Sequence, residues 1–387
     1  MKSINIIGAG VAGLALATLL IRNGFFVNVY EKRKQGTRPG GGLSLTPNGA
    51  SVMKELGIYQ KLILSGAPVN DLEIKMADGT VLSRVPIEGE LRYGAHFVAL
   101  RREVLIKILE KNFLDIGGKI HYEKKLIAID NKDASVKSFF ADGSREVSDV
   151  LIGADGVHSA VRKSIFPRFA KEVETPLIGI GGFIEGSKLK SHIRIEEMSL
   201  FIGDFGLFGC CGASDSEFMW WSSIARDRLP KDYSNFDVKH YLKSHHRKSS
   251  NQVQKVIEHV DHILMVDNFT LPPLESWSSG RVCLIGDAAH PVLPDSGQGA
   301  SMALEDAALL AEFLSITNSP ENAFSQFEQE RRKRVLRVKK IGDDRARSKI
   351  KSSGLSGALS RALLPTLFKL KPKNSDDWLF GYKAHIQ

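Results

Sequence analysis

The first 30 residues alternate between apolar runs and glycine-rich turns. Residues 3–7 form a short β-branched run that predicts a strand, and residues 25–30 predict a second strand. The stretch between them, residues 11–20, is apolar nearly all round, as expected for a helix buried between a sheet and its neighbours. Asn23 and Gly24 end that helix. This order of elements predicts a parallel βαβ unit at the start of the chain.

The middle third of the chain has a different pattern. Between residues 175 and 223, short apolar runs alternate with turn residues, which is typical of strands that pair in an antiparallel sheet. Such a sheet, laid over a cofactor domain, would form the roof of a binding pocket. The four runs lie at 178–184, 199–202, 206–209 and 217–223.

Aromatic residues in these runs are candidates for contact with a small molecule. Strand alternation places Phe218 and Trp220 on one face of the last run and Met219 and Trp221 on the other. The pattern does not decide which face meets a ligand, and an aromatic residue of a sheet is more often part of the core. We take Phe201, Phe218 and Trp220 as the candidate substrate contacts.

The turn after the first strand carries glycines in the spacing G-x-G-x-x-G. Gly8 permits a tight turn, Gly10 allows the backbone to approach a pyrophosphate, and Gly13 lets the following helix lie close to the sheet. The start of that helix offers unpaired N–H groups and a positive dipole to phosphates. Glu31 ends the second strand, where its carboxylate can accept hydrogen bonds from a ribose. The unit therefore predicts a dinucleotide site and leaves NAD and FAD open.

Two later segments each place an acidic residue where a buried strand ends. Residues 149–153 lead into Asp155 and a glycine turn, and residues 281–285 lead into Gly286 and Asp287. Asp287 only accepts hydrogen bonds, which suits ribityl or ribose hydroxyls. A glycine loop, with Gly297 and Gly299, then opens a helical stretch at 300–314 whose start can hold an anionic group.

With these motifs in this order, the chain resembles the class A flavoprotein monooxygenases, which have the para-hydroxybenzoate hydroxylase fold. Within that family it is most similar to the salicylate, hydroxybenzoate and urate hydroxylases. The resemblance runs from end to end of the chain. Its diagnostic positions are the glycine unit, Asp155-Gly156 with Ser159 and Arg162, Gly286-Asp287 with Pro294, residues 40–49, residues 100–103, and the tail at 377–382.

The resemblance implies FAD as the cofactor, with NADH or NADPH as the reductant. Of two neighbouring arginines, the spacing to Glu103 and Leu105 favours Arg101 over Arg102 as the one that faces the cofactor. No second glycine unit serves the nicotinamide cofactor, in agreement with the family. The implied FAD-binding residues are Gly8, Gly10, Ala12, Gly13, Glu31, Lys32, Gly42, Leu43, Arg101, Asp155, Asp287, Pro294, Gly297, Gln298, Gly299 and Ala300.

The implied reaction is hydroxylation of an aromatic or polycyclic small molecule. FAD reduced by NAD(P)H would capture O₂ as a flavin C4a-hydroperoxide and deliver one oxygen atom to the substrate. Because the cofactor supplies the chemistry, we assign no protein acid or base and no metal site. Pro294 alone is placed near the site of oxygen activation. The alternatives are an antibiotic-modifying monooxygenase of the tetracycline-inactivating kind, an epoxidase, and a flavin-dependent reductase or non-catalytic FAD protein.

The fold class expected from these patterns is α/β. A Rossmann-like FAD-binding domain is interleaved with a substrate domain built on a mixed or antiparallel β-sheet, and helices end the chain. We expect the FAD-binding domain at 1–72, 97–172 and 268–350, the substrate domain at 73–96 and 173–267, and a C-terminal helical segment at 351–387.

Composition and charge exclude several other classes of protein. With 43% hydrophobic and 25% charged residues, the 387-residue chain is typical of a globular protein. The net charge of +9 resides in residues 331–351, which hold eleven basic and two acidic side chains, while the rest of the chain carries 42 of each sign. A nucleic-acid-binding face would spread its charge more widely, so we expect no nucleic-acid partner.

The basic segment invites three interpretations. Much of residues 331–340 is expected to form one solvated helix face. The remainder could attract NADPH phosphates or, with the apolar stretch 355–370, bind weakly to an anionic membrane surface. Three cysteines are too few for a disulfide framework and suggest reduced thiols in the cytoplasm. Monomer and homodimer are both compatible with the sequence.

Overall fold

The N-terminal unit has the predicted order of elements. The computed structural model describes residues 3–37, 40–131, 134–169, 171–233, 235–350 and 376–385. Strand β1 (Ser3–Ile7) is followed by helix α1 (Val11–Arg22) and strand β2 (Phe26–Tyr30). β1 pairs in parallel with β2 on one side and with β12 (Val150–Gly153) on the other. The prediction of a parallel unit at the start of the chain is confirmed.

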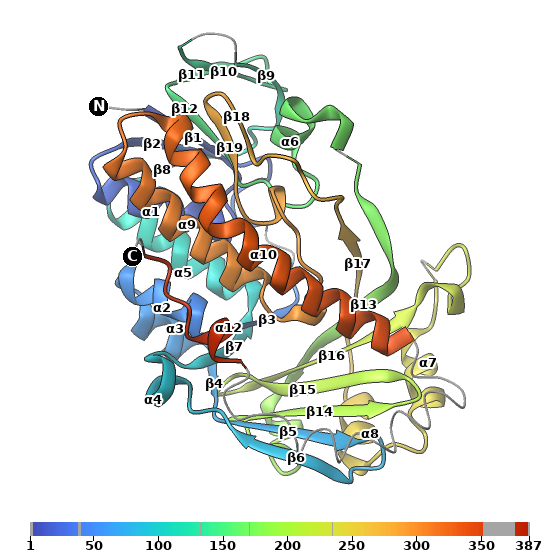
Figure 1. Cartoon of the computed structure of the whole chain (residues 1–387). Coiled ribbons are helices and arrows are strands. Elements are labelled where there is room, and N and C mark those ends of the chain that lie inside the picture. Colours follow the sequence, from blue (N-terminus) through green and yellow to red (C-terminus); the bar gives the residue numbers. More distant parts are fainter. Residues whose placement is uncertain are drawn as a thin grey trace.

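A six-stranded sheet is built around this unit, in the order β18-β19-β12-β1-β2-β8. The added strands are β8 (Lys119–His121), β19 (Val282–Leu284) and the short antiparallel edge strand β18 (Ser278–Ser279). Helices α1, α5 (Arg102–Asp115), α9 (Gly299–Ile316) and α10 (Pro320–Ile350) lie side by side over this sheet (Figure 1). Most side chains of α1 and α9 are buried, which explains why α1 is apolar nearly all round and why α9 is apolar along most of its length.

Two three-stranded sheets accompany the six-stranded sheet. One has the order β3-β7-β4, with β3 at Gly42–Leu45, β7 at Phe97–Arg101 and β4 at Ala67–Val69. The other has the order β11-β10-β9, with β9 at Leu126–Asp130, β10 at Val136–Phe140 and β11 at Arg145–Ser148.

A seven-stranded sheet forms the lower part of the molecule in Figure 1, in the order β17-β13-β16-β15-β14-β5-β6. All of its pairs are antiparallel except β5–β14. This mixed sheet beside a parallel one confirms the α/β fold class. The division into domains stays a prediction. The strands are β5 (Asp71–Met76), β6 (Val81–Pro86), β13 (Val173–Glu185), β14 (Glu197–Gly203), β15 (Gly206–Ser214), β16 (Glu217–Ala225) and β17 (Leu264–Thr270).

The two faces of the seven-stranded sheet have different neighbours. One face packs against helices α7 (Val238–His245) and α8 (Asn251–Glu258) and forms a separate apolar core. Met219 lies on the opposite face, in a cluster with β4 and β7. An added Cβ on Gly42 of β3 would lie 2.4 Å from the Met219 sulfur.

The three aromatic residues expected at the substrate lie on the helix-covered face. Phe201, Phe218 and Trp220 are at most 2% exposed and belong to the core beneath α7 and α8. We correct this expectation: the alternation along β16 was right, but apolar helices cover the face that we chose. The face toward β3 and β7 carries Met219 and the half-buried Trp221 instead.

The remaining helices are short. Among the described residues they are α2 (Pro47–Glu55), α3 (Tyr59–Ser65), α4 (Gly89–Tyr93), α6 (Ala160–Ile165) and α12 (Asp377–Phe380), with 3-10 turns at Pro167–Phe169, Gly186–Lys188, Arg226–Arg228, Gly286–Ala288 and Pro294–Ser296.

Helix α10 carries most of the basic segment, and its exposed residues Lys333, Arg337 and Lys340 form a solvated face as expected, but not all of the cations lie on it. Arg331 is fully buried and Arg334 is 8% exposed, because both lie against α9. Within the described part of the chain, no helix is both long and apolar enough to cross a membrane. The apolar stretch 355–370 and the start of the expected C-terminal segment lie outside the described residues.

A buried histidine gives the seven-stranded unit a predicted pH dependence. Burial, with a smaller contribution from His245, lowers the pKa of His246 to about 4. An unfolded histidine titrates near 6.5, so the unfolded state takes up a proton first as the pH falls, and stability is lost between about pH 6.5 and 4. We expect His246→Phe, which keeps an aromatic ring beside Phe205 and Phe208, to remove up to about 3 kcal/mol of the loss between pH 7 and 4.

The measurement is urea unfolding at both pH values. His245→Phe is the matched control, because His245 is exposed. An equal loss of stability in His246→Phe and in the wild type would contradict the assignment.

Candidate functional site

The glycine loop between β1 and α1 is closed on one side and open on the other. Gly8 has φ +110°, and a Cβ there would lie 2.5 Å from the carbonyl oxygen of Ala154. A Cβ on Gly13 would lie 2.0 Å from the carbonyl oxygen of Gly8. No atom lies within 4 Å of the place a Gly10 Cβ would take. The loop is thus packed tightly against β12, and its free side at Gly10 is open to a ligand.

Glu31 fixes the loop from the end of β2. Its Oε2 accepts a hydrogen bond from the Ala9 N–H at 3.0 Å, and its Oε1 accepts one from the Arg33 N–H at 3.0 Å. Each oxygen keeps a second lone pair with which it can accept a hydroxyl. Lys32 is exposed beside it.

Asp155 brings a buried acceptor to the same place. Its Oδ2 accepts the N–H groups of Ala160 and Val161 at 2.7 and 3.3 Å, at the start of α6. Its Oδ1 is buried and has no hydrogen-bond partner. Burial raises the pKa of the carboxyl, although hydrogen bonds from Ser159 and the helix oppose this. A Cβ on Gly8 would lie 2.9 Å from the Asp155 Cα, so the two motifs adjoin.

The Gly286-Asp287 turn also contacts α1. Gly286 has φ +58°, and a Cβ there would lie 3.4 Å from that of Ala12. Asp287 is exposed to water, yet the surrounding protein raises the pKa of its carboxyl by desolvation, which the charges of Arg102 and His290 partly offset. The Asp287 carboxylate is therefore surrounded by protein atoms but keeps contact with water on one side.

Arg102, and not Arg101, faces this region. Arg101 donates from Nε and Nη2 to both oxygens of Glu217, at 2.6 and 2.5 Å, and its guanidinium lies 3.7 Å from the ring centre of Phe183. Arg101 is thus held by the seven-stranded sheet. Arg102 is exposed and packs beside Gly40, and its charge is the largest of those that lower the pKa of Asp287. The spacing argument could not include Glu217, which binds the Arg101 side chain where β7 ends.

The loop before α9 completes the surface. Pro294 and Gly297 are exposed, and nothing lies within 4 Å of a Cβ built on Gly297, whose φ is +65°. Gln298 points inward and accepts a hydrogen bond from Asn48 Nδ2 at 3.0 Å. Gly299 and Ala300, half-buried, begin α9 with no acidic residue in its first turn. Its first N–H groups have no helical partners and offer a positive end to an anion.

A buried ionic cluster of Glu305, Asp306, Arg331 and Arg334 supports this loop from below. Arg331 lies 2.6 Å from Glu305 Oε2 and 2.8 Å from Asp306 Oδ1. Arg334 binds both oxygens of Glu305, at 2.8 and 2.7 Å. Arg334 also donates to the backbone carbonyls of residues 378 and 379, which ties the C-terminal tail to α10.

The ionic cluster reaches the cofactor turn through Asp306. Its Oδ2 accepts the Gly286 N–H at 2.8 Å and lies 2.7 Å from His290 Nε2. Burial alone would raise the pKa of Asp306, but the charges of His290 and Arg331 outweigh it and lower the pKa to about 2. Asp306 therefore remains ionised and holds the turn that carries Asp287.

The sequence contained a signal for this cluster that we did not use. Glu305 and Asp306 are two adjacent acids inside an otherwise apolar helix, and such charges are rarely buried unless paired. Arg331 and Arg334 follow at a helical spacing of three. His290 is placed by the same cluster.

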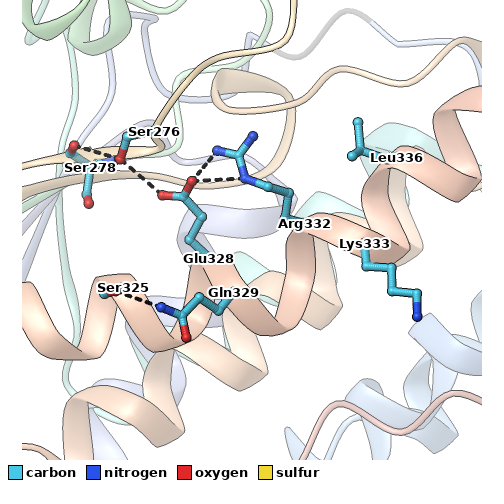
Figure 2. Close-up of a pocket in the computed structure, with 8 residues that line it drawn as sticks. All are labelled: Ser276, Ser278, Ser325, Glu328, Gln329, Arg332, Lys333 and Leu336. Atoms are coloured by element: carbon cyan, nitrogen blue, oxygen red, sulfur yellow. Dashed lines mark hydrogen bonds and ion pairs between the residues drawn. The ribbon is translucent and has the colours of Figure 1, made fainter.

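A surface hollow of about 720 Å³ lies elsewhere, along the outer side of α10 (Figure 2). Figure 2 shows Glu328 between Arg332 and Ser276, so its carboxylate is already paired. None of the residues from the glycine unit, the Gly286-Asp287 turn or the α9 loop lines it. The convergent site, and not this hollow, is the candidate functional site.

The structure thus brings together residues that are far apart in sequence. The glycine unit adjoins Asp155, and through Ala12 it adjoins the Gly286-Asp287 turn, which also lies against Ala303 of α9. Strand β3, which contacts α9, carries the exposed Gly42 and the half-buried Leu43. Backbone N–H groups, hydroxyl acceptors and one cation are the groups that hold a flavin dinucleotide. The residues present fit FAD.

We predict that the ionic cluster holds the fold. Arg331→Met leaves two buried carboxylates without their shared cation and should lower the free energy of unfolding by about 3 to 5 kcal/mol. Lys333→Met removes the same charge from an exposed position and should change it little. Denaturant unfolding of both variants checks this, and equal stabilities would contradict it.

Comparison with known proteins agrees with the site. The family described as "FAD binding domain" matches residues 1–341. A 6-hydroxynicotinate 3-monooxygenase from Bordetella bronchiseptica is 28% identical over 99% of this chain and 96% of its own. HpxO from Klebsiella pneumoniae, solved with FAD and uric acid, has a TM-score of 0.83 and 24% identity, covering 95% of this chain and 93% of that one. The tetracycline destructase Tet(55) has a TM-score of 0.70 and 24% identity, covering 89% of each chain.

The family match spans the glycine unit, Asp155, the Gly286-Asp287 turn and the α9 loop, which are the parts that the structure brings together. The resemblance inferred from the motifs is thereby confirmed. The chain belongs to the FAD binding domain family and is a class A flavoprotein monooxygenase.

Proposed function

We propose that this monooxygenase hydroxylates a small aromatic ring, with FAD held by the convergent site and NAD(P)H as the reductant. The observation that carries the proposal is the position of Asp287, a carboxylate that water reaches within a surround of protein, between the glycine unit and the α9 loop. A dinucleotide that spans these motifs would fill that region.

We assign each part of FAD to a different group of residues. Gly8, Gly10, Ala12 and Gly13 would hold the pyrophosphate at the start of α1, and Glu31 the adenosine ribose. Asp287, with Arg102 beside it, would hold the ribityl region. We propose Arg102 in place of Arg101 for this role. When bound, FAD supplies the hydride acceptance and oxygen activation that no side chain provides.

The N-terminus of α9 would stabilise negative charge on the reduced flavin. Its free N–H groups act with the helix dipole, and such an arrangement is worth about 1 to 2 kcal/mol when partly buried. Pro294, exposed on this loop, would border the place where oxygen reacts and keep water from it. Gly297, Gln298, Gly299 and Ala300 give the loop its shape.

The substrate would bind beneath the seven-stranded sheet, on the face toward β3. Cross-strand register places Trp221 beside Gly181 on β13 and Gly209 on β15, so no neighbouring side chain covers its ring on these strands. Val266 of β17 is 51% exposed next to Gly179 on the same face. Flat apolar surface of this kind suits an aromatic ring.

Comparison also bears on substrate size. One relative is named a 6-hydroxynicotinate 3-monooxygenase, and HpxO was solved in complex with uric acid; both compounds are small ring systems. The tetracycline destructase agrees less well in fold, with a TM-score of 0.70 against 0.83. This favours a small substrate over a polycyclic antibiotic.

We further propose that the enzyme resides in the cytoplasm. Cys210, Cys211 and Cys283 are free and buried, and burial raises the pKa of the Cys210 thiol to about 12, as suits a protein of the reducing cytoplasm. Monomer and homodimer remain alternatives.

The direct test is anaerobic reduction of the purified holoprotein by NADPH or NADH with a panel of ligands. We expect small phenols, pyridines or purines to accelerate flavin bleaching at least tenfold, and product to retain one atom of ¹⁸O₂ (a tenfold rate change is about 1.4 kcal/mol). Acceleration by tetracyclines alone would favour the antibiotic-modifying alternative. Failure of every ligand would favour a reductase or a non-catalytic FAD protein.

The two arginines provide a matched pair of variants. Arg102→Gln should raise the Kd for FAD roughly tenfold, since a charge-assisted contact near Asp287 is lost. Arg101→Gln should leave the Kd near its wild-type value, because Arg101 binds Glu217. FAD titration of the apoprotein by fluorescence measures both. The opposite order would return the role to Arg101.

A further inference from the structure

The end of α10 grips the loop that leads into α9. Arg345 Nη1 donates to the backbone carbonyls of Asp295 and Ser296, at 3.1 and 3.4 Å. Lys349 Nζ lies 2.8 Å from Asp295 Oδ1, and both side chains are largely buried, at 15% and 7% exposure. Two cations from one helix therefore bind two consecutive residues of a single turn.

Apolar contacts make the fit continuous. Gly342 faces the same turn, and a Cβ there would lie 3.4 Å from those of Leu293 and Ser296. Ala346 joins Leu293 and Leu177 in a small buried cluster. The helix thus lies flush against the turn, between its two cations.

The opposite side of the turn is exposed. Pro294 and Gly297 face water, while Gln298 is fixed inward by Asn48. The turn is therefore bound on the side that faces α10 and accessible to a ligand on the side of Pro294 and Gly297. Here the ligand is FAD, so the role inferred for the turn rests on the proposed function.

We propose that Arg345 and Lys349 are positioning residues for the flavin-facing turn. The N–H groups of the same two peptides donate within the turn, from Ser296 to the Leu293 carbonyl and from Gly297 to the Pro294 carbonyl, both at 2.9 Å, so the cations hold the turn from its carbonyl side. Charge-assisted hydrogen bonds are about twice as strong as neutral ones. The contacts of Arg345 and Lys349 with residues 295 and 296 would fix the position of the turn relative to the bound flavin. The two cations then serve the cofactor through the turn, and neither a membrane nor NADPH phosphates need to engage them.

The same lysine touches the substrate side of the molecule. A Cβ built on Gly206, where β14 turns into β15, would lie 3.5 Å from the Lys349 Cβ. Figure 1 shows α10 crossing from the six-stranded sheet to the strands of the seven-stranded sheet. Lys349 therefore sets the spacing between the flavin-facing turn and a hairpin of the sheet that covers the substrate.

The test compares Arg345→Gln and Lys349→Gln with Arg347→Gln in the full-length protein. Arg347 is the control, because it lies on the same helix, 67% exposed, and pairs only loosely with Asp344 at 3.9 Å. Two readouts are hydrogen exchange of residues 293–299, with and without FAD, and the reduction potential of bound flavin at saturating FAD.

We expect exchange of the turn to quicken roughly tenfold in Arg345→Gln and Lys349→Gln, in line with the loss of one charge-assisted bond. The flavin potential should shift to a more negative value, because a loosened turn stabilises the reduced anion less. Arg347→Gln should match the wild type in both. Arg345→Lys keeps the positive charge but loses the guanidinium group, so its exchange rate and flavin potential should lie between those of the wild type and Arg345→Gln.

Two results would overturn the inference. If both Gln variants match Arg347→Gln in exchange and potential, the grip has no role. If FAD fails to slow exchange of residues 293–299 in the wild type, the proposed position of FAD is itself wrong, and the inference fails with it. Should Arg345→Gln not fold, Lys349→Gln and Arg345→Lys provide the same comparison.

Discussion

The pairing of Glu305 and Asp306 with two arginines is the interaction on which the rest of the structure depends. Two adjacent carboxylates inside an apolar helix are tolerable only because Arg331 and Arg334 neutralise them where no water reaches. From these four groups, hydrogen bonds extend to the Gly286 N–H, to Asn48 and to the C-terminal tail. The cluster therefore sets the relative positions of the flavin-flanking loop, the acidic turn and the tail.

Much of the fold could be predicted from the sequence because its signals are local. The glycine unit sets a strand, a turn and a helix within 22 residues, and β1 and α1 lie where the pattern placed them. The strands of the middle third were also predicted from apolar runs bounded by turn residues. What the runs could not give was the face of the sheet. Which side of β16 meets helices depends on residues 238–258, far along the chain.

The site was predicted in part for the same reason. Motifs that act through their own backbone, such as Gly8 and Gly13, were assigned from spacing alone. The direction of Arg101 could not be read from its neighbours in sequence, because it depends on Glu217, a partner 116 residues away. The basic segment misled in a similar way: its charges resembled a solvated face, yet Arg331 and Arg334 neutralise acids that lie on another helix.

Helix α10 has a consequence for how the family boundary should be understood. The family match ends at residue 341, yet α10 continues without a break to Ile350. A shortened chain that stopped at the match would keep the residues of the glycine unit and the acidic turn but would lose Arg345, Lys349 and the tail clamped by Arg334. Such a fragment would retain every recognisable FAD motif but would expose the apolar side chain of Leu293. Loss of function on truncation would then reflect the loss of the contacts by which the end of α10 connects the turn before α9 to the seven-stranded sheet.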